Sequence, residues 1–237
     1  MYVKEGKDVD EGEAKMTELA RTLTGLPIPQ VYHVKQEGDS TFIYLEAMPG
    51  ELIGWWHLFP LGRAERALRA NLVSAVQQLH AVRAPPDARV GGYGRKPLSA
   101  LLQDAAISAS LDSAADLHAW LRASYLRKFP SSSAEYDTEF SPHMDDSAPL
   151  VLVHGDLRSM NILVHKNRIS GIIDFGRAGW YPEWVEGMAP TMELWKGADL
   201  ANQRIAEAVL GERFVEQEEY RWIAHARWGW PGQSAPE

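Results

Sequence analysis

The stretch LVLVHGDLRSMNILVHKNRISGIIDFG, residues 150–176, decides the fold that this sequence predicts. Its runs LVLV, NILV and RISGIID are rich in Val, Ile and Leu and predict three short strands. Polar side chains follow these runs: Asp156 and Asn161 are five residues apart, and Asp174 lies thirteen residues beyond Asn161. If LVLV and NILV flank a loop and RISGIID is the return strand, the three side chains converge at one end of a hairpin.

Two carboxylates and one amide are hard oxygen ligands of the kind that Mg²⁺ prefers, usually together with substrate phosphates. Phosphoryl-transfer enzymes use this layout: an Asp that accepts the proton of the acceptor hydroxyl, an Asn on metal, and a second Asp on metal after the next strand. Taken singly, Asp156 is better explained by a turn or a helix cap, and Asn161 by an Asx turn. The combined spacing favours phosphoryl transfer.

Composition sets wider bounds. A chain of 237 residues, 45% hydrophobic and 24% charged, is long enough for one core or for two small lobes that share a cleft. The net charge of -8 and the lack of a basic stripe argue against nucleic-acid binding. No run is apolar enough for a signal peptide or a membrane span, so we expect a soluble, cytoplasmic protein. The oligomeric state stays open.

Thiol chemistry and a zinc site are both disfavoured. The chain has no cysteine, and its eight histidines are scattered without zinc-ligand spacing. The first 50 residues predict strand, helix, strand and strand, in the ranges 2–4, 11–25, 31–34 and 41–48. From Pro60 onward the periodicity becomes helical, and helical segments continue through Arg227. Two connecting loops are expected, GGYGRKP at 91–97 and an exposed acidic loop at 130–149.

Three motifs carry a resemblance to a known family: HGDLRSMNILV (154–164), ISGIIDFG (169–176) and AGWYPEWVE (178–186). The chain resembles the aminoglycoside phosphotransferase and choline kinase group, in particular its fungal branch. The resemblance implies an α+β, protein-kinase-like fold of two lobes. Residues 1–50 would form a partial N-terminal nucleotide-binding lobe and hinge, and residues 51–237 a mainly helical lobe with the catalytic loop and the acceptor site. The N-terminal lobe is expected to be truncated.

Carried over to this sequence, the resemblance makes Asp156 the catalytic base and places Asn161 and Asp174 on Mg²⁺. His154 would brace the catalytic loop. Arg158 would steady the transferred phosphate, or would be an ordinary exposed loop arginine.

The nucleotide side of the resemblance implies ATP as cofactor. Lys4 would hold the α- and β-phosphates and pair with Glu13, with Glu11 as the alternative partner. Glu46 to Met48 would form the hinge, whose backbone hydrogen-bonds adenine.

The acceptor is expected to be a hydroxyl-bearing small molecule. A cationic amine would suit Glu183, Glu186, Glu193 and the acidic loop, which otherwise form a solvated acidic surface. Trp180, Trp184 and Trp195 would line an acceptor cleft or pack in the core. The sequence thus predicts an ATP- and Mg²⁺-dependent O-phosphotransferase. The alternative is a catalytically weak, kinase-like binding or regulatory module that lacks the first N-terminal strands.

Overall fold

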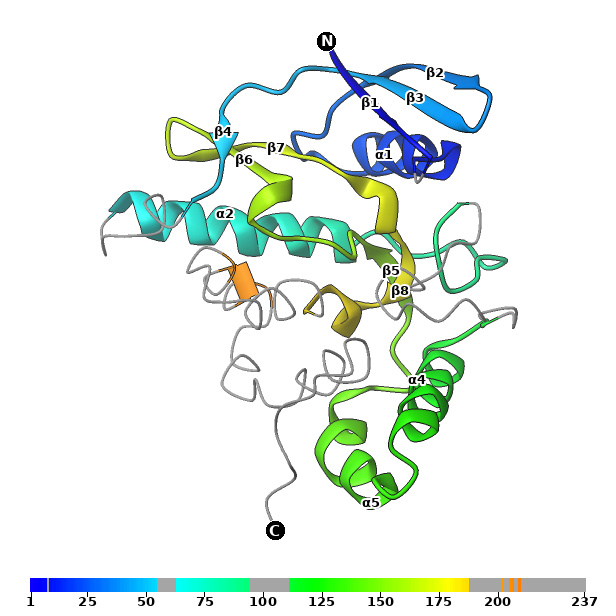
Figure 1. Cartoon of the computed structure of the whole chain (residues 1–237). Coiled ribbons are helices and arrows are strands. Elements are labelled where there is room, and N and C mark those ends of the chain that lie inside the picture. Colours follow the sequence, from blue (N-terminus) through cyan, green and yellow to red (C-terminus); the bar gives the residue numbers. More distant parts are fainter. Residues whose placement is uncertain are drawn as a thin grey trace.

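A computed structural model describes residues 1–7, 9–54, 63–93 and 111–187, together with the single positions 202, 205, 206 and 209. In Figure 1 a small sheet and helix α1 lie at the top. The strands that follow the catalytic loop cross the middle above the long helix α2, and helices α4 and α5 lie at the bottom. The residues that the sequence predicts for the site come from the upper and middle parts.

The N-terminal lobe is a three-stranded antiparallel sheet packed on one helix. Its strands are β1 (Tyr2–Gly6), β2 (Val31–Glu37) and β3 (Ser40–Leu45), in the order β1-β3-β2, and its helix is α1 (Glu11–Leu23). On β3 every second residue, Thr41, Ile43 and Leu45, is buried, as expected for a strand with one covered face. The predicted order of strand, helix, strand and strand is confirmed.

Helix α1 begins where its sequence provides a cap. The Asp10 carboxylate accepts a hydrogen bond from the Glu13 backbone N–H at 3.1 Å, and Glu11 and Glu13 place negative charge in the first turn. The helix ends at Leu23, just before Gly25 and the prolines that follow. Asp10 therefore fixes the turn of α1 that carries Glu13.

The middle of the molecule contains a second antiparallel sheet. Strands β4 (Glu51–Leu52), β6 (Ile162–His165) and β7 (Arg168–Ile172) are hydrogen-bonded in the order β4-β6-β7. Helix α2 (Arg63–His80) packs against this sheet and contributes Leu68, Leu72, Val76 and Leu79 to the largest core. Lys166 and Asn167 join β6 to β7 with φ angles of 50° and 61°, as a tight two-residue hairpin turn requires.

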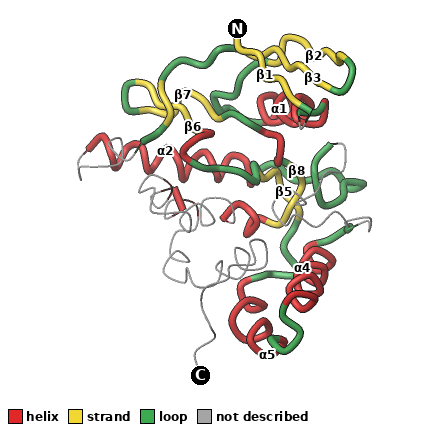
Figure 2. The backbone as a smooth tube through the Cα atoms, in the orientation of Figure 1, coloured by secondary structure: helices red, strands yellow, loops and turns green. Residues whose placement is uncertain are grey.

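A two-stranded ribbon separates two cores. Strand β5 (Leu150–Val153) pairs with β8 (Gly179–Pro182). Leu152 belongs to the core that contains α2, whereas Val151 and Val153 belong to the core that contains α4 (Ala114–Lys128), because successive side chains of a strand face opposite ways. Figure 2 shows this ribbon between the two helices. The catalytic loop follows β5 directly and is thus anchored in both cores.

The expectation of an irregular loop at 130–149 is wrong, whereas its acidic side chains Asp137, Asp145 and Asp146 are exposed as expected. This segment forms helical turns in α5 (Ser133–Glu135), η2 (Tyr136–Phe140) and η3 (Ser141–His143). Tyr136 is fully buried against α4, and Arg122 on α4 contacts the Asp137 carboxylate through two hydrogen bonds of 2.7 Å. His118 Nδ1 lies 2.7 Å from Asp146. One buried aromatic ring and partners for the acidic side chains hold the segment in place.

Several expected segments lie outside the described residues. These are the helical region around 99–110, Glu193 and Trp195. Within the described ranges, no helix is long and apolar enough to cross a membrane.

Replacing Tyr136 by alanine tests the corrected description of this segment. We expect Tyr136→Ala to lower the free energy of unfolding by about 3–5 kcal/mol, because a fully buried aromatic ring is removed. Thr138→Ala, on the exposed side of the same turns, is the control and is expected to stay within about 0.5 kcal/mol. Urea denaturation measures both, and equal effects of the two substitutions would contradict the burial.

Candidate active site

The catalytic loop begins with a turn that only glycine fits well. Gly155 has a φ of +73°, and a Cβ atom at this position would lie 2.6 Å from the Arg177 carbonyl oxygen. The backbone of 154–156 can therefore pass close to the segment that follows Asp174. This close approach brings the first and the last part of the expected site together.

His154 links the two halves of the site. Its Nδ1 accepts a hydrogen bond from the Asp156 backbone N–H at 3.2 Å, so its Nε2 carries the proton and donates to the Ile173 carbonyl at 3.0 Å. The ring is fully buried and packs on Phe175, with 4.6 Å between ring centroids. His154 thus holds the loop residue Asp156 in register with the residue just before Asp174.

Glu186 lies beneath the catalytic loop, not on a solvated acidic surface. It belongs to η6 (Glu183–Gly187) and is fully buried. Its two carboxylate oxygens accept the backbone N–H groups of His154 and Gly155 at 2.8 and 3.1 Å. The expectation that Glu186 attracts a cationic substrate is wrong, since its carboxylate is used to hold the loop.

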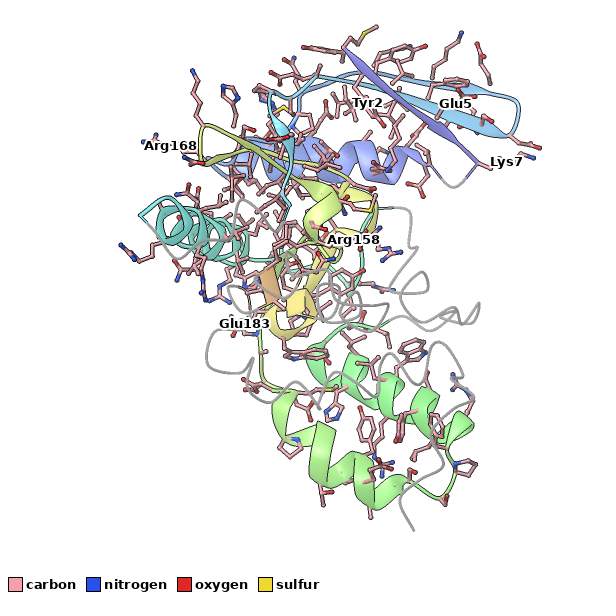
Figure 3. All side chains as sticks on the ribbon, turned by 60° about the vertical axis from the view of Figure 1, so that its left-hand side comes forward. Tyr2, Glu5, Lys7, Arg158, Arg168 and Glu183 are labelled. Atoms are coloured by element: carbon pink, nitrogen blue, oxygen red, sulfur yellow. The ribbon has the colours of Figure 1, made fainter. Side chains whose placement is uncertain are left out.

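Asp156 is surrounded by hydrogen-bond donors. The Asn161 amide nitrogen, on η4 (Ser159–Asn161), donates to the Asp156 carbonyl at 2.7 Å and to its Oδ2 at 3.1 Å. Arg177 Nη1 lies 3.0 Å from Asp156 Oδ1, and Arg158 Nε lies 3.3 Å from the same oxygen. Figure 3 shows Arg158 in the middle of the molecule. Arg158 is therefore a partner of Asp156 and not an exposed loop arginine.

Asp174 stands at the junction of the two lobes. It has a left-handed backbone, with a φ of 67°, which directs the chain from β7 into the short turn η5 (Phe175–Arg177). Its Oδ1 accepts a hydrogen bond from Lys4 Nζ at 2.8 Å. Lys4 Nζ also donates to both Glu13 oxygens, at 2.7 and 2.9 Å, whereas Glu11 lies 3.5 Å from Lys15. Of the two partners considered for Lys4, the structure places Glu13 against it.

Burial and charge oppose one another in this three-residue contact. Burial alone would lower the pKa of Lys4, but the carboxylates of Glu13 and Asp174 outweigh it and raise that pKa above its ordinary value. Burial raises the pKa of Glu13, which Lys4 offsets in part. Burial also disfavours the charged form of Asp174, yet the Lys4 ammonium prevails and lowers the pKa of Asp174. Asp174 is consequently a carboxylate at neutral pH.

The two expected metal ligands are held on a common frame. The Ile173 backbone N–H donates to the Asn161 carbonyl at 3.0 Å, while the Ile173 carbonyl accepts from His154. One ionised carboxylate, Asp174, and one amide, Asn161, match the small protein ligand set with which Mg²⁺ binds nucleotide phosphates. Within the described ranges, no cluster of three or more His, Cys, Asp or Glu residues forms a separate metal site.

The expected hinge is only partly available to a nucleotide base. The Glu46 backbone N–H donates to the Gln30 carbonyl at 2.9 Å, and the Glu46 side chain accepts from Gln30 N–H at 3.1 Å. Met48 lies against β7, where its Cβ would be 3.1 Å from a side chain at Gly171. The N–H and the carboxylate of Glu46 are thus used within the lobe, and of the expected hinge residues Met48 adjoins the central sheet.

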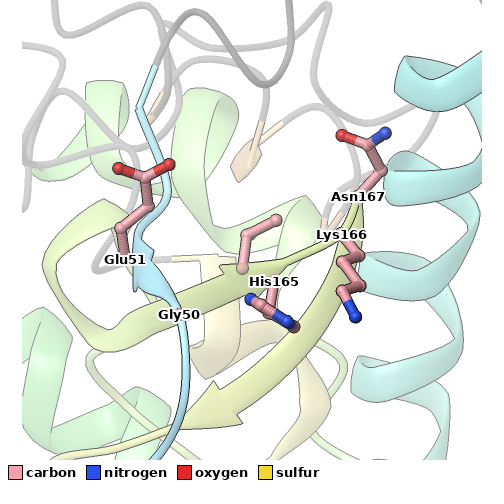
Figure 4. Close-up of a pocket in the computed structure, with 6 residues that line it drawn as sticks. Gly50, Glu51, His165, Lys166 and Asn167 are labelled. Atoms are coloured by element: carbon pink, nitrogen blue, oxygen red, sulfur yellow. The ribbon is translucent and has the colours of Figure 1, made fainter.

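A polar pocket opens beside the hinge, between the start of β4 and the β6–β7 turn (Figure 4). It is lined by Gly50, Glu51, Val164, His165, Lys166 and Asn167. None of the residues expected to bind nucleotide or metal lines it. The pocket is therefore distinct from the candidate active site.

The tryptophans near the site belong to the core. Trp180 and Trp184 are buried, at 9% and 4% exposure, on opposite sides of the ribbon. Of the acidic residues expected near the acceptor, Glu183 is exposed. Arg177 was not predicted, because nothing in the sequence distinguishes an arginine that reaches a carboxylate 21 residues away.

These features define a class of protein. The small sheet with α1, the hinge, the mainly helical second lobe and the site between them form a protein-kinase-like fold. The model of the phosphotransferase enzyme family (APH) matches residues 8–226, and the chain belongs to this family. It is therefore a phosphotransferase. The fold and the family together support its assignment to the phosphotransferases that act on small molecules. No curated protein matches the chain in sequence.

Solved structures share the fold at low sequence identity. Aminoglycoside phosphotransferase APH(4)-Ia has a TM-score of 0.62 and 15% identity, over 94% of this chain and 76% of that one. A thermostable mutant of APH(4)-Ia in ternary complex with ADP and hygromycin B has a TM-score of 0.57 and 17% identity, over 95% and 75%. ADP-bound APH(2'')-Ib reaches 0.50 at 17% identity, over 93% and 77%.

Replacing Glu186 by glutamine tests its place beneath the loop. Burial raises the pKa of Glu186, but the His80 and His154 rings and the His154 backbone N–H outweigh it, so that pKa lies below its ordinary value of 4.5. Because glutamine offers one acceptor oxygen to two buried N–H groups, we expect Glu186→Gln to cost about 1–3 kcal/mol of stability at pH 7.

The same substitution has a pH signature with a definite sign. A carboxyl group whose pKa is lowered by folding stabilises the fold above pH 4.5. This stabilisation is lost as the pH falls through the lower pKa that the group has in the folded protein. The difference in unfolding free energy between wild type and Glu186→Gln is therefore expected to shrink as the pH falls below 4.5. Denaturation curves between pH 7 and pH 3 measure it, with exposed Glu183→Gln as control. A constant difference across this range would contradict the assignment.

Proposed function

We propose that this chain is an ATP- and Mg²⁺-dependent O-phosphotransferase that transfers the γ-phosphoryl group of the nucleotide to a hydroxyl of a small molecule. The observation that carries the proposal is the contact of Lys4 with both Glu13 and Asp174, next to the bonded pair Asp156 and Asn161. The two groups are linked through Ile173, which precedes Asp174 in the chain and is hydrogen-bonded to both His154 and Asn161.

In this proposal each side chain has one task. Lys4 holds the α- and β-phosphates and is itself oriented by Glu13. Asn161 and Asp174 would hold Mg²⁺, which would supply positive charge to offset that of the phosphates. Asp156 accepts the proton of the acceptor hydroxyl. The hydroxyl oxygen then bonds to the γ-phosphorus, and the bond between the γ-phosphorus and the oxygen that leaves with ADP breaks.

The arginines beside Asp156 have separate tasks. Arg177, in the turn that follows Asp174, contacts Asp156 and sets the direction of its carboxylate. Arg158 is half-buried on the loop itself and is assigned to the charge that develops on the transferred phosphoryl group. His154 and Glu186 act at a distance from the reacting atoms by holding the loop backbone.

The ligands of the relatives support the proposed reactants. APH(4)-Ia forms ternary complexes with hygromycin B and either ADP or AMP-PNP, and APH(2'')-Ib is ADP-bound. By analogy we assign an adenine nucleotide and a hydroxyl-bearing small molecule to this chain. A cationic acceptor would meet the exposed carboxylate of Glu183.

Asp156→Asn tests the assignment of the base. Loss of general-base catalysis is expected to lower turnover by about 10²–10⁴-fold, while nucleotide affinity changes by less than about threefold. ADP formation from ATP and Mg²⁺ is followed with hygromycin B, with choline and with water as acceptors. Nucleotide affinity is measured by calorimetry.

The matched control is Asp39→Asn, in the exposed turn between β2 and β3, which is expected to match wild type in both assays. Turnover by Asp156→Asn at the wild-type rate would refute the assignment of the base. A wild-type chain that binds nucleotide with Mg²⁺ but forms no ADP would favour a binding module over an enzyme.

A further inference from the structure

Three backbone segments meet at a junction of glycines beside the candidate active site. We call Gly12, Gly91, Gly92 and Gly179 the glycine junction. Gly12 lies in the first turn of α1, Gly91 and Gly92 begin the loop 91–93, and Gly179 begins β8. The sequence suggested only an ordinary loop for GGYGRKP, and the proposed reaction assigns no role to it.

The segments approach more closely than side chains allow. A Cβ atom on Gly12 would lie 2.2 Å from the Tyr93 carbonyl oxygen, and one on Gly92 would lie 2.3 Å from the Ala178 carbonyl oxygen. A Cβ on Gly179 would lie 2.4 Å from the Gly91 carbonyl carbon. Ordinary van der Waals contact begins at 3.4 Å, and all three obstacles are backbone atoms. A side chain at any of these positions therefore displaces a segment.

Hydrogen bonds fasten the loop to β8. Gly91 and Trp180 exchange two backbone hydrogen bonds, of 3.1 and 2.9 Å, which add the loop to the edge of β8. On its other side the loop packs against α1: the Tyr93 carbonyl lies next to Gly12, and a Cβ on Gly92 would lie 3.7 Å from Met16 Cγ. The loop is thus a fixed surface against which α1 rests.

The position of α1 determines the ion pair of the site. Glu13 follows Gly12 directly, and its carboxylate holds Lys4 at 2.7 and 2.9 Å. The same carboxylate would lie 3.1 Å from a Cβ on Gly176, so it is also packed against the turn after Asp174. A shift of about 1 Å in the first turn of α1 is enough to break such hydrogen bonds.

We infer that the glycine junction positions Glu13: the loop 91–93 holds the first turn of α1 at the distance from β8 at which Glu13 reaches Lys4. The expected effect on nucleotide binding rests on the proposed function, whereas the expected effect on the contact between Lys4 and Glu13 does not. Gly12 and Gly92 are accordingly positioning residues that act through Glu13 and touch no reactant.

The test is a double-mutant cycle on the binding of AMP-PNP with Mg²⁺, measured by calorimetry. Gly12→Ala and Gly92→Ala are each expected to weaken binding about tenfold, or about 1.4 kcal/mol. In a Glu13→Gln background, where the charged pair is already lost, the same substitutions are expected to weaken binding by less than about twofold. Gly25→Ala is the control, because its Cβ would meet only the flexible Gln78 side chain, at 3.3 Å.

A second measurement reads the ion pair without nucleotide. The free amine reacts with acetic anhydride, so loss of the Glu13 contact is expected to raise acetylation of Lys4, relative to exposed Lys35, by at least about threefold in both glycine variants. Peptide mass spectrometry gives this ratio under conditions where circular dichroism shows a folded chain. Gly12→Ala could also disturb the Asp10 cap of α1, because a Cβ on Gly12 would lie 2.8 Å from the Asp10 carboxylate. Gly92→Ala tests the glycine junction without this complication, because the nearest atoms to a Cβ on Gly92 belong to Ala178 and Met16.

Equal losses of affinity in the two backgrounds, or an unchanged acetylation ratio in the folded variants, would overturn the inference. If wild type binds no AMP-PNP, the proposed function fails, and the acetylation ratio alone then decides the inference.

Discussion

The contact of one ammonium group with two carboxylates joins the two halves of the candidate active site. Lys4 comes from the edge strand of the small sheet, Glu13 from α1, and Asp174 from the turn after β7. Lys4 and Glu13 are near each other in the sequence, whereas Asp174 is 170 residues from Lys4. The salt bridge between Lys4 and Asp174 therefore joins the two lobes at the point where phosphates and metal are expected.

The framework below this contact is made largely of hydrogen bonds between buried side chains and backbone groups. His154 connects the Asp156 N–H to the Ile173 carbonyl, and Glu186 accepts two further N–H groups of the same loop. These side chains are buried, so each hydrogen bond is shielded from water and its loss leaves a polar group unsatisfied. A site built in this way keeps Asp156, Asn161 and Asp174 in register with one another.

Much of this arrangement could be predicted from local sequence. The apolar runs at 150–176 gave the strands β5, β6 and β7, and the spacing of Asp156, Asn161 and Asp174 indicated the chemistry that the family assignment supports. The order of elements in the N-terminal lobe also followed from periodicity. These features depend on residues near one another in the chain, for which side-chain pattern is informative.

The errors concern polar residues whose surroundings come from distant segments. Glu186 is charged and lies close to Glu183 in the sequence, which favoured a surface position. The neighbouring residues Trp184 and Val185 are core residues, and these apolar neighbours were the signal in the sequence that Glu186 is buried. The acidic stretch around Asp137 was expected to be an irregular loop, because the groups that hold its helical turns, among them Arg122, lie on another helix. Arg177 and the glycine junction escaped notice for the same reason, since close backbone approach has no periodic signature.

The most direct test of the account is the affinity of Lys4→Met for AMP-PNP with Mg²⁺, measured by calorimetry beside wild type and beside Lys7→Met, an exposed lysine just beyond the end of β1. The account predicts metal-dependent binding by wild type and Lys7→Met, and binding at least about tenfold weaker by Lys4→Met. Equal affinity of Lys4→Met and wild type would contradict it, because the ammonium that joins the lobes would then not be the group that holds the phosphates.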